Sequence, residues 1–245
     1  MNALAIMPVK DEADILPWSI RHLQDQGLKV HVIDNWSTDG SWEMLRGRGV
    51  SGERWPRGGP DTLYQCKAML DRVDEVAASS SADWCMFNDA DEIRRSSRDE
   101  SLLAGFERVE SEGFNAINFK LYYFRPIDNG YSGDPEKYFQ HYALNHCDCR
   151  LQHVKAWRNT GQRVNLSAHG SHRLEFDGLK VYLESWMLKH YPIRSQAHGE
   201  RKMRERLVRF DPAEQARGWH VQYRGMEAPG HNFLADPSTL QRWPT

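Results

Sequence analysis

The stretch ALAIMPVKDEADILPWSIRHLQDQGLKVHVID, residues 3–34, combines two short apolar segments with an amphipathic segment between them. Residues 3–7 are continuously apolar, which is typical of a strand buried on both faces of a parallel sheet. Residues 16–23 carry apolar side chains at helical spacing, and Gly27 follows where such a helix would end. Residues 30–33 form the second apolar segment. The stretch therefore predicts a strand–helix–strand unit.

Two acidic residues precede expected helices. Asp14 is expected to cap the helix just described, with Pro17 tolerated in its first turn. Asp61 is expected to cap a second helix, whose apolar stripe consists of Cys66, Met69, Leu70, Val73 and Val76. A strand is expected next at residues 83–87. Strands that alternate with helices predict an α/β fold with a mainly parallel central sheet flanked by helices.

The second half of the chain has less regular patterns. Its expected elements are a helix at 102–109, strands at 116–124, 153–157 and 181–188, and a helix at 196–210. No internal repeat or long linker is visible in the sequence. We therefore expect one domain over residues 1–245, with a nucleotide-binding half at 1–125 and an acceptor-side half at 126–245.

The composition excludes several classes of protein. Of 245 residues, 40% are hydrophobic and 27% are charged, which is ordinary for a globular chain. The net charge of −2 gives no basic field for nucleic acid. No basic leader or apolar run of about 20 residues is present, so we expect a cytoplasmic protein. In that compartment the four cysteines are expected to be thiols: Cys66, Cys85, Cys147 and Cys149.

The segment WCMFNDADEI, residues 84–93, ends an apolar strand in an acidic cluster. Ligands of open α/β sheets bind beyond the carboxyl ends of the strands. Asp89 and Asp91 could both face one hard cation there, since such cations prefer oxygen ligands. The alternative is a solvated acidic turn that caps a following helix. Glu92 could either support the site or cap that helix.

Two other polar segments follow expected strands. Lys10, Asp11 and Glu12 come after the first strand, and Asp34 ends the second. Carboxylates at such positions can accept hydrogen bonds from a base edge or from ribose hydroxyl groups. Each segment could instead be a helix cap or a side-chain-stabilised turn. Three acidic strand ends that meet at one sheet edge favour a ligand site.

Three segments in this order resemble the successive motifs of family 2 glycosyltransferases: MPVKDEADILPWSIRHLQDQG (7–27), VIDNWSTDGS (32–41) and DWCMFNDADEI (83–93). The resemblance is strongest to a bacterial branch with a D-x-D-E-like motif. It covers the first 125 residues well, and weaker motifs continue to about residue 205. This chain differs in having Asp11 where Asn is common, and Asn88 before the cluster.

The resemblance implies a GT-A fold, a UDP- or GDP-sugar donor and a divalent cation, Mn²⁺ or Mg²⁺. It implies that residues 10–12 and Asp34 line the nucleoside pocket. Asp89 and Asp91 would face the ribose and the metal-bound diphosphate, with Asp91 the more direct ligand. Transfer with inversion of the sugar is also expected only through the resemblance.

The segment LKHYPIRS, residues 188–195, resembles the H-Y-x-x-R-S segment of the same branch. His190 could bind the cation or a phosphate, or it could simply pack against its neighbours. The basic helix that follows is by default a solvated face. Arg194 and Lys202 could nevertheless stabilise the charge of a departing pyrophosphate. A polar cluster at 169–172 is expected on the acceptor side.

The catalytic base is the least defined residue. Inverting transfer needs a carboxylate that accepts the proton of the acceptor hydroxyl. Glu175, Asp177 and Glu184 precede the His190 segment, where the family carries this group. We favour Glu184, on an expected strand, because burial there would raise its pKa.

The sequence thus predicts a metal-dependent glycosyltransferase of the hexosyltransferase type that acts on a glycan or lipid-linked acceptor, as in polysaccharide biosynthesis. A lipid-linked acceptor would require peripheral contact with the inner face of the membrane. Two alternatives remain open. A D-x-D phosphohydrolase would use its first aspartate as a nucleophile, and a non-catalytic nucleotide-sugar-binding protein would keep the cation site without a base.

Overall fold

The computed structural model describes residues 1–144, 153–170, 173–216, 218, 225–226, 228 and 230–244. Its elements follow along the chain as β1 (Ala3–Val9), α1 (Leu16–Asp25), β2 (Lys29–Asp34), η1 (Glu43–Leu45), β3 (Ser51–Arg54), α2 (Cys66–Ser79), β4 (Trp84–Phe87), β5 (Glu92–Arg95), α3 (Leu102–Ser111), β6 (Ala116–Phe124), α4 (Pro135–Tyr138), β7 (His141–Leu144), β8 (His153–Arg158), η2 (Leu166–His169), β9 (Trp186–His190), α5 (Gln196–Leu207), α6 (Pro212–Ala216), η4 (Pro237–Thr239) and β10 (Gln241–Arg242).

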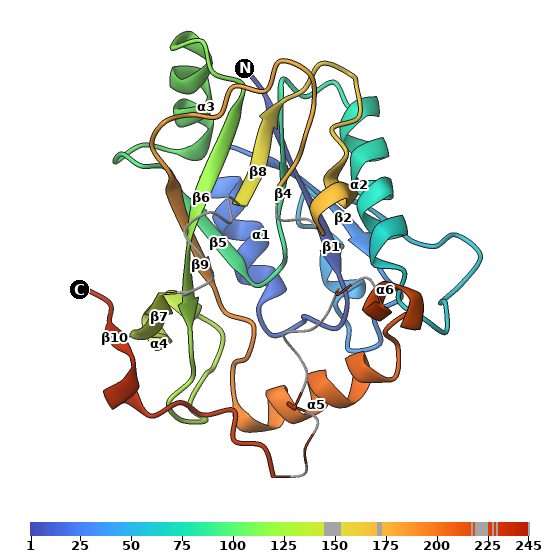
Figure 1. Ribbon diagram of the computed structural model, residues 1–245, viewed down its shortest axis with the longest axis vertical. Coiled ribbons are helices and arrows are strands. Elements are labelled where there is room, and N and C mark those ends of the chain that lie inside the picture. Colours follow the sequence, from blue (N-terminus) through green and yellow to red (C-terminus); the bar gives the residue numbers. More distant parts are fainter. Residues whose placement is uncertain are drawn as a thin grey trace.

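The strands of the described residues form one mixed sheet, with the order β10-β7-β6-β8-β4-β1-β2-β3 (Figure 1). Strand β1 pairs in parallel with both β2 and β4, and β2 pairs in parallel with β3. In the second half, β8 joins β4 and β6 in antiparallel register, and β9 pairs with β5 and β6. The predicted α/β fold is confirmed, with parallel pairs among β1, β2, β3 and β4 in the first half of the chain, and with antiparallel pairs and the parallel pair β6–β9 added by the second.

Apolar side chains fill both faces of this sheet. Along β1, Ala5 and Met7 belong to one core cluster and Ile6 to the other, because successive side chains of a strand point to opposite faces. The first cluster includes the apolar residues of α1 and α3, and the second includes those of α2. The continuous apolar run in the sequence therefore reflects a strand that is buried on both sides.

Both predicted helix caps are wrong. No side chain caps α1, and Asp14 instead pairs with Arg194, which lies 180 residues further along the chain. Helix α2 begins later than expected, so Asp61 precedes it by several residues. The carboxylate of Glu214, in α6, accepts hydrogen bonds from the first two N–H groups of α2. A cap supplied from so far along the chain leaves no local signal in the sequence.

Three elements differ from their predicted form. The Gly-rich segment after β2, for which the sequence shows no strand pattern, contains strand β3. Residue Glu92 begins strand β5, so its predicted alternative as a helix cap is wrong. The expected strand at 181–188 is shifted, since β9 runs over Trp186–His190. The strands at β1, β2, β4 and β6 agree with the sequence patterns.

Gly105 brings α3 into contact with β9. A Cβ added at Gly105 would lie 2.6 Å from Cη2 and 2.9 Å from Cζ2 of Trp186. Such overpacking costs about 1–3 kcal/mol, against a gain of about 1 kcal/mol in helix propensity. We expect Gly105→Ala to lower the free energy of unfolding by about 1–2 kcal/mol, measured by equilibrium denaturation. Gly58→Ala, where an added Cβ meets nothing within 4 Å, is the control. Equal losses in both variants would contradict this packing.

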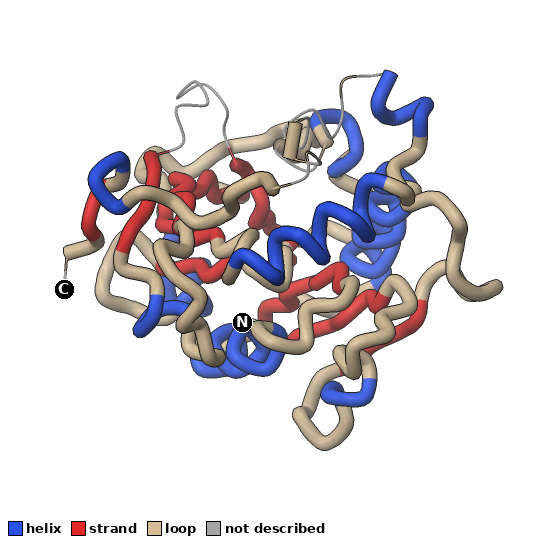
Figure 2. The backbone as a smooth tube through the Cα atoms, turned by 90° about the horizontal axis from the view of Figure 1, so that it is seen from below, coloured by secondary structure: helices blue, strands red, loops and turns tan. Residues whose placement is uncertain are grey.

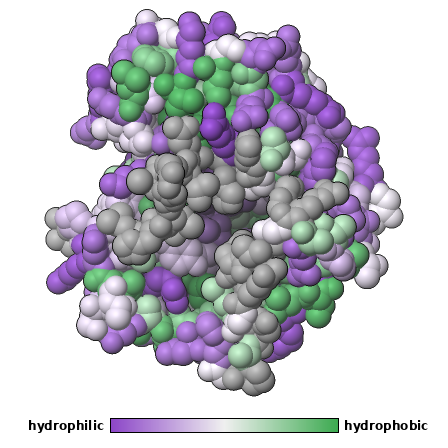
Figure 3. Space-filling view, in the orientation of Figure 1, coloured by the Kyte–Doolittle hydropathy of each residue, from purple (hydrophilic) through white to green (hydrophobic). Residues whose placement is uncertain are grey.

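Helix α5 crosses the sheet at the end where β1 terminates, which is the lower end in Figure 1. Seen from below, in Figure 2, it lies across the middle of the molecule in front of the strands. Hydrophilic residues occupy much of the face shown in Figure 3. Among the described residues, no helix is both long and apolar enough to cross a bilayer.

Candidate functional site

Three strand ends meet beneath α5. Because β1, β2 and β4 are parallel, their carboxyl ends lie at the same edge of the sheet. The order β3-β2-β1-β4 means that the chain leaves β1 toward β2 and later returns on the other side as β4. In α/β sheets, the crevice at such a switch point is where ligands bind. This edge carries three of the acidic segments singled out from the sequence.

The loops after β1 and β2 are tied to each other. The Lys10 ammonium donates to the carbonyl of Trp36 over 2.6 Å. Asp11, at a φ of 54°, accepts from the backbone N–H of Thr38 over 2.6 Å, and its own N–H donates to the Ser37 hydroxyl. Lys10 and Asp11 therefore hold the second loop in place.

Asp34 ends β2 and is fully buried. Burial raises the pKa of its carboxyl, and hydrogen bonds from Ser37 and the charge of Arg54 oppose that rise. The Arg54 guanidinium lies 3.2 Å from Asp34 and over the rings of Trp36 and Trp42, at 5.1 and 5.3 Å from their centres. The guanidinium and indole rings beside this carboxylate can stack on a flat, polar ligand such as a nucleobase.

The acidic cluster forms a tight turn between β4 and β5. The backbone N–H of Glu92 donates to the carbonyl of Asp89 over 3.0 Å, which closes the turn. The buried Arg94 guanidinium donates to the carbonyl of Phe87 and to the side chain of Asn88, and it pairs with Glu92. These contacts hold the turn from inside, so the cluster is not a solvated acidic turn.

Asp91 is buried between two basic side chains. Its Oδ2 accepts from the Lys202 ammonium over 3.1 Å, and its Oδ1 lies 3.5 Å from Nε2 of His190. Burial alone would raise the pKa of Asp91, but the charge of Lys202 and the neighbouring His190 imidazole hold it well below its usual range. Asp91 is therefore an ionised carboxylate. Residue His190 reaches it because β9 pairs His190 directly with Glu92 of β5.

Asp89 is the more accessible aspartate, with 40% of its side chain exposed. Its Oδ2 accepts from the buried ammonium of Lys155 over 3.2 Å. Lys155 also lies 2.9 Å from Oε1 of Glu92. Burial opposes ionisation of Glu92, but Lys155 and Arg94 lower its pKa to about 2. Each aspartate of the cluster thus has one oxygen bound to a buried lysine.

The side chain of Glu12 contacts α5 and the segment before it, whereas Lys10 and Asp11 contact the loop after β2. Oε2 of Glu12 lies 2.5 Å from the Arg194 guanidinium, and its Oε1 lies 2.9 Å from the Lys202 ammonium. Arg194 is fully buried and also holds both oxygens of Asp14, at 2.6 and 2.7 Å. The fourth hydrogen bond of the Arg194 guanidinium goes to the carbonyl of Tyr191. Arg194 therefore ties the loop after β1 to the segment before α5.

Among the described residues, one group of three side chains could supply closely spaced metal ligands: Glu12, Asp14 and His198. The Arg194 guanidinium already pairs with both of these carboxylates. Burial, together with Arg194 and Lys202, lowers the pKa of His198 far below its usual value, so the imidazole is neutral. A cation here would have to displace a bidentate arginine.

The pair Asp91 Oδ1 and His190 Nε2 fits a cation better. Their separation of 3.5 Å is close to the roughly 3 Å expected between adjacent ligands bound at about 2.1 Å. Carboxylate oxygens suit Mg²⁺ and Mn²⁺, and imidazole is accepted by transition metals. Asp89 stands two positions before Asp91 and is the more exposed of the two, but it does not form a closely spaced group of three with Asp91 and His190, so it could contribute through a bridging water. We therefore regard these three residues as the candidate cation ligands.

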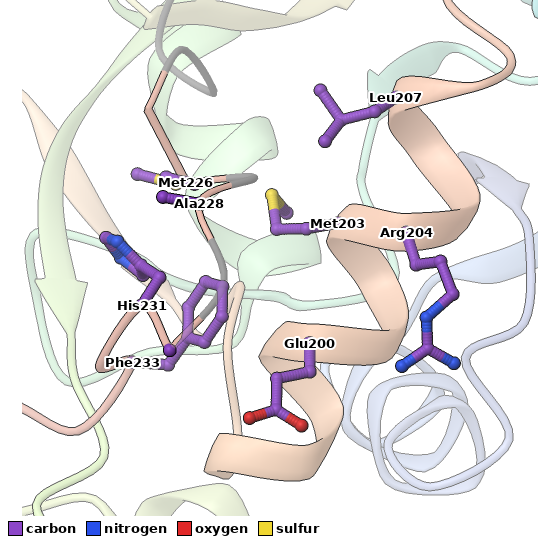
Figure 4. Close-up of a pocket in the computed structure, with 9 residues that line it drawn as sticks. Glu200, Met203, Arg204, Leu207, Met226, Ala228, His231 and Phe233 are labelled. Atoms are coloured by element: carbon purple, nitrogen blue, oxygen red, sulfur yellow. The ribbon is translucent and has the colours of Figure 1, made fainter.

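A cavity of about 320 Å³ lies elsewhere, between α5 and the segment near residues 226–233 (Figure 4). Glu200, Met203, Arg204 and Leu207 of α5 line it. At 100° per residue, these positions lie on the side of the helix opposite Lys202. The cavity is therefore separated from the strand ends by α5, and none of the predicted site residues lines it.

The burial on which the choice of Glu184 as the base rests is not found in the structure. The side chain of Glu184 is exposed, precedes β9 and accepts a hydrogen bond from the Ser97 hydroxyl over 3.0 Å. Strand β9 alone separates Trp186 from His190 by roughly 13 Å at 3.3 Å per residue. Glu184 therefore lies near the opposite end of β9 from the site, and its side chain is exposed.

Other sequence predictions concern residues away from this site. Glu175 and Asp177 are exposed. Ser171, His172, Cys147 and Cys149 lie outside the described residues, and so does the side chain of His169. The two described cysteines, Cys66 and Cys85, are free thiols as expected.

Sequence reasoning missed Arg54, Lys155 and Asp14, which contact the site directly. Arg54 belongs to a segment rich in Gly and Pro that shows no strand pattern. Lys155 stands in a short apolar strand far along the chain from the cluster it binds. One feature of the sequence indicated a role for Lys155. It stands between Val154 and Ala156 in an apolar strand, where a buried charge needs a partner.

The comparisons with known proteins are weak at the level of sequence. No protein-family model matches the chain, and no curated protein matches it. Similar solved structures include mannosyl-3-phosphoglycerate synthase from Rubrobacter xylanophilus, with 22% identity and a TM-score of 0.36, over 54% of this chain and 43% of that chain. TarS from S. aureus has 13% identity and a TM-score of 0.43, over 85% of this chain and 39% of that chain.

Glucosyl-3-phosphoglycerate synthase from Mycobacterium tuberculosis, solved with Mn²⁺, UDP and phosphoglyceric acid, has 20% identity and a TM-score of 0.34, over 50% of this chain and 43% of that chain. The chain thus spans less than half of the length of each of these three proteins. All three TM-scores lie below 0.5, and the α/β assignment therefore rests on the strand order described above.

Proposed function

We propose that this chain is a metal-dependent glycosyltransferase of the GT-A type, which transfers a sugar from a nucleoside diphosphate donor to a glycan or lipid-linked acceptor. The observation that carries the proposal is the meeting of Asp34, Asp91 and His190 at one switch point of the sheet. The first 125 residues would bind the donor, and the remainder would close the site and face the acceptor.

Each residue has a distinct role in this proposal. Asp34, beside the stacked Arg54, would accept hydrogen bonds from the nucleoside. Asp91 and His190, with Asp89, would hold Mn²⁺ or Mg²⁺, which supplies charge neutralisation for the diphosphate. Lys10 and Asp11 would fix the loop that borders the nucleoside. Arg194 and Glu12 would keep the loop after β1 in place, since their charges are already paired with protein groups.

The reaction is tested by incubating the purified protein with a panel of UDP- and GDP-sugars and Mn²⁺. UDP is the first nucleotide to try, because it is the one present in the M. tuberculosis complex. We expect release of the nucleoside diphosphate, at least by slow hydrolysis of the donor. Release of inorganic phosphate from phosphate esters would instead indicate a phosphohydrolase. Binding of the donor without turnover, even with acceptor extracts, would indicate a non-catalytic binding protein.

Glu184→Gln is expected to leave the rate of donor turnover within about twofold of wild type, because a surface substitution distant from the site changes little. The measurement is nucleoside diphosphate release under saturating donor and Mn²⁺. A loss of transfer with intact donor binding would restore Glu184 as the base and would contradict its exposed position beside Ser97.

A further inference from the structure

Lys202 has an ammonium whose hydrogen-bonding capacity is used entirely within the protein. Its Nζ lies 2.9 Å from Oε1 of Glu12, 3.1 Å from Oδ2 of Asp91 and 3.0 Å from the carbonyl of Pro192. An ammonium has three N–H donors, so all three are accounted for. The residue is buried, with 7% of its surface exposed. In this arrangement Lys202 has no donor left to bind a diphosphate directly.

The position of Lys202 is next to the candidate cation ligands. It binds Oδ2 of Asp91, and this leaves Oδ1 as the oxygen that faces His190. It approaches from α5, whereas the equivalent contact to Asp89 comes from Lys155 on β8. The carboxylates of Asp91 and Asp89 are therefore partly neutralised by lysines even when no divalent cation is bound.

We propose that Lys202 is a positioning residue that serves as an internal counter-cation of Asp91. It orients the carboxylate so that Oδ1 is presented beside His190, and its charge weakens the binding of a divalent cation while the donor is absent. Two positive charges a few ångströms apart repel each other strongly in a partly buried site. A nucleoside diphosphate brings negative charge that offsets this repulsion.

This inference rests on the proposed function, because it concerns the same cation site. Its consequence is that cation and nucleotide bind cooperatively: each should increase the affinity of the other by the same factor. Without Lys202, Asp91 keeps only His190 and Glu12 keeps only Arg194 as a basic neighbour, so Asp91 should bind a divalent cation readily with no nucleotide present. The coupling between cation and nucleotide should then become smaller.

The test is a titration of the full chain with Mn²⁺ alone, in which free Mn²⁺ is measured by electron paramagnetic resonance. We expect Lys202→Met to bind Mn²⁺ at least about tenfold more tightly than wild type, since a repulsive charge at this range is lost. Lys202→Arg keeps the charge and should remain close to wild type. Lys67→Met, at an exposed lysine of α2, is the matched control. Repeating the titration with UDP should raise the affinity more in wild type than in Lys202→Met.

Circular dichroism first establishes that each variant is folded, and Lys202→Gln takes the place of Lys202→Met if the latter does not fold. Unchanged or weaker Mn²⁺ binding in the charge-removing variant would overturn the inference. Mn²⁺ binding by Lys202→Arg that is as tight as binding by Lys202→Met would also overturn it, because the loss of charge would then not be the cause of the tighter binding. If the proposed function is wrong, the result is different: wild type would neither bind UDP nor release it from a UDP-sugar.

Discussion

Asp91→Asn is expected to reduce donor turnover by roughly 100- to 1,000-fold, the range found when a central electrostatic contact of an active site is removed. The substitution keeps the shape of the side chain but removes the charge that faces His190 and Lys202. A neutral amide oxygen is a poorer ligand for a hard cation than a carboxylate is. Nucleoside diphosphate release and Mn²⁺-dependent donor binding both measure the effect.

The matched control is Asp99→Asn, at an exposed aspartate before α3. It removes the same charge from the chain and should leave turnover unchanged. Thermal unfolding of both variants separates a lost ligand from a lost fold. If Asp91→Asn binds the donor with Mn²⁺ as tightly as wild type does, then Asp91 is not a cation ligand.

Arg194→Leu is expected to lower the free energy of unfolding by about 3–5 kcal/mol, the usual effect of removing one partner of a buried ion pair. The guanidinium is fully buried and is the partner of both Glu12 and Asp14. Without it, Glu12 stays buried with Lys202 as its remaining cation. Equilibrium denaturation with guanidinium chloride or urea measures the loss.

Arg194→Lys should fall between wild type and Arg194→Leu, because a lysine keeps the charge but cannot bind Asp14 through two parallel hydrogen bonds. Arg21→Leu, at an exposed arginine of α1, should change stability by no more than about 0.5 kcal/mol. Equal stability of Arg194→Leu and wild type would contradict the ion-pair network beneath α5.

The parts of the fold that the sequence predicts are those determined by local patterns. The apolar runs of β1, β2, β4 and β6 follow from burial of strands, and the helical spacing of α1 and α3 follows from one buried face. Because these strands are parallel, the carboxylates at their ends meet at one edge, as the sequence suggested for Asp34 and Asp91.

The parts that the sequence does not predict depend on contacts between distant residues. Glu12 and Arg194 are 182 residues apart, and Glu214 caps α2 from 148 residues away. Glu184 illustrates the same limit: the expected strand at 181–188 begins five residues before β9, so Glu184 lies in an exposed loop and not in a buried strand. The partners of these buried charged groups are therefore visible only in the structure.

The central claim is tested most directly by a crystal structure of the chain with UDP and Mn²⁺. The account predicts Mn²⁺ bound to Asp91 and His190 and in contact with the diphosphate, with the uracil and ribose beside Asp34 and Arg54. Mn²⁺ bound instead at Glu12, Asp14 and His198, or UDP bound away from the ends of β1, β2 and β4, would contradict it.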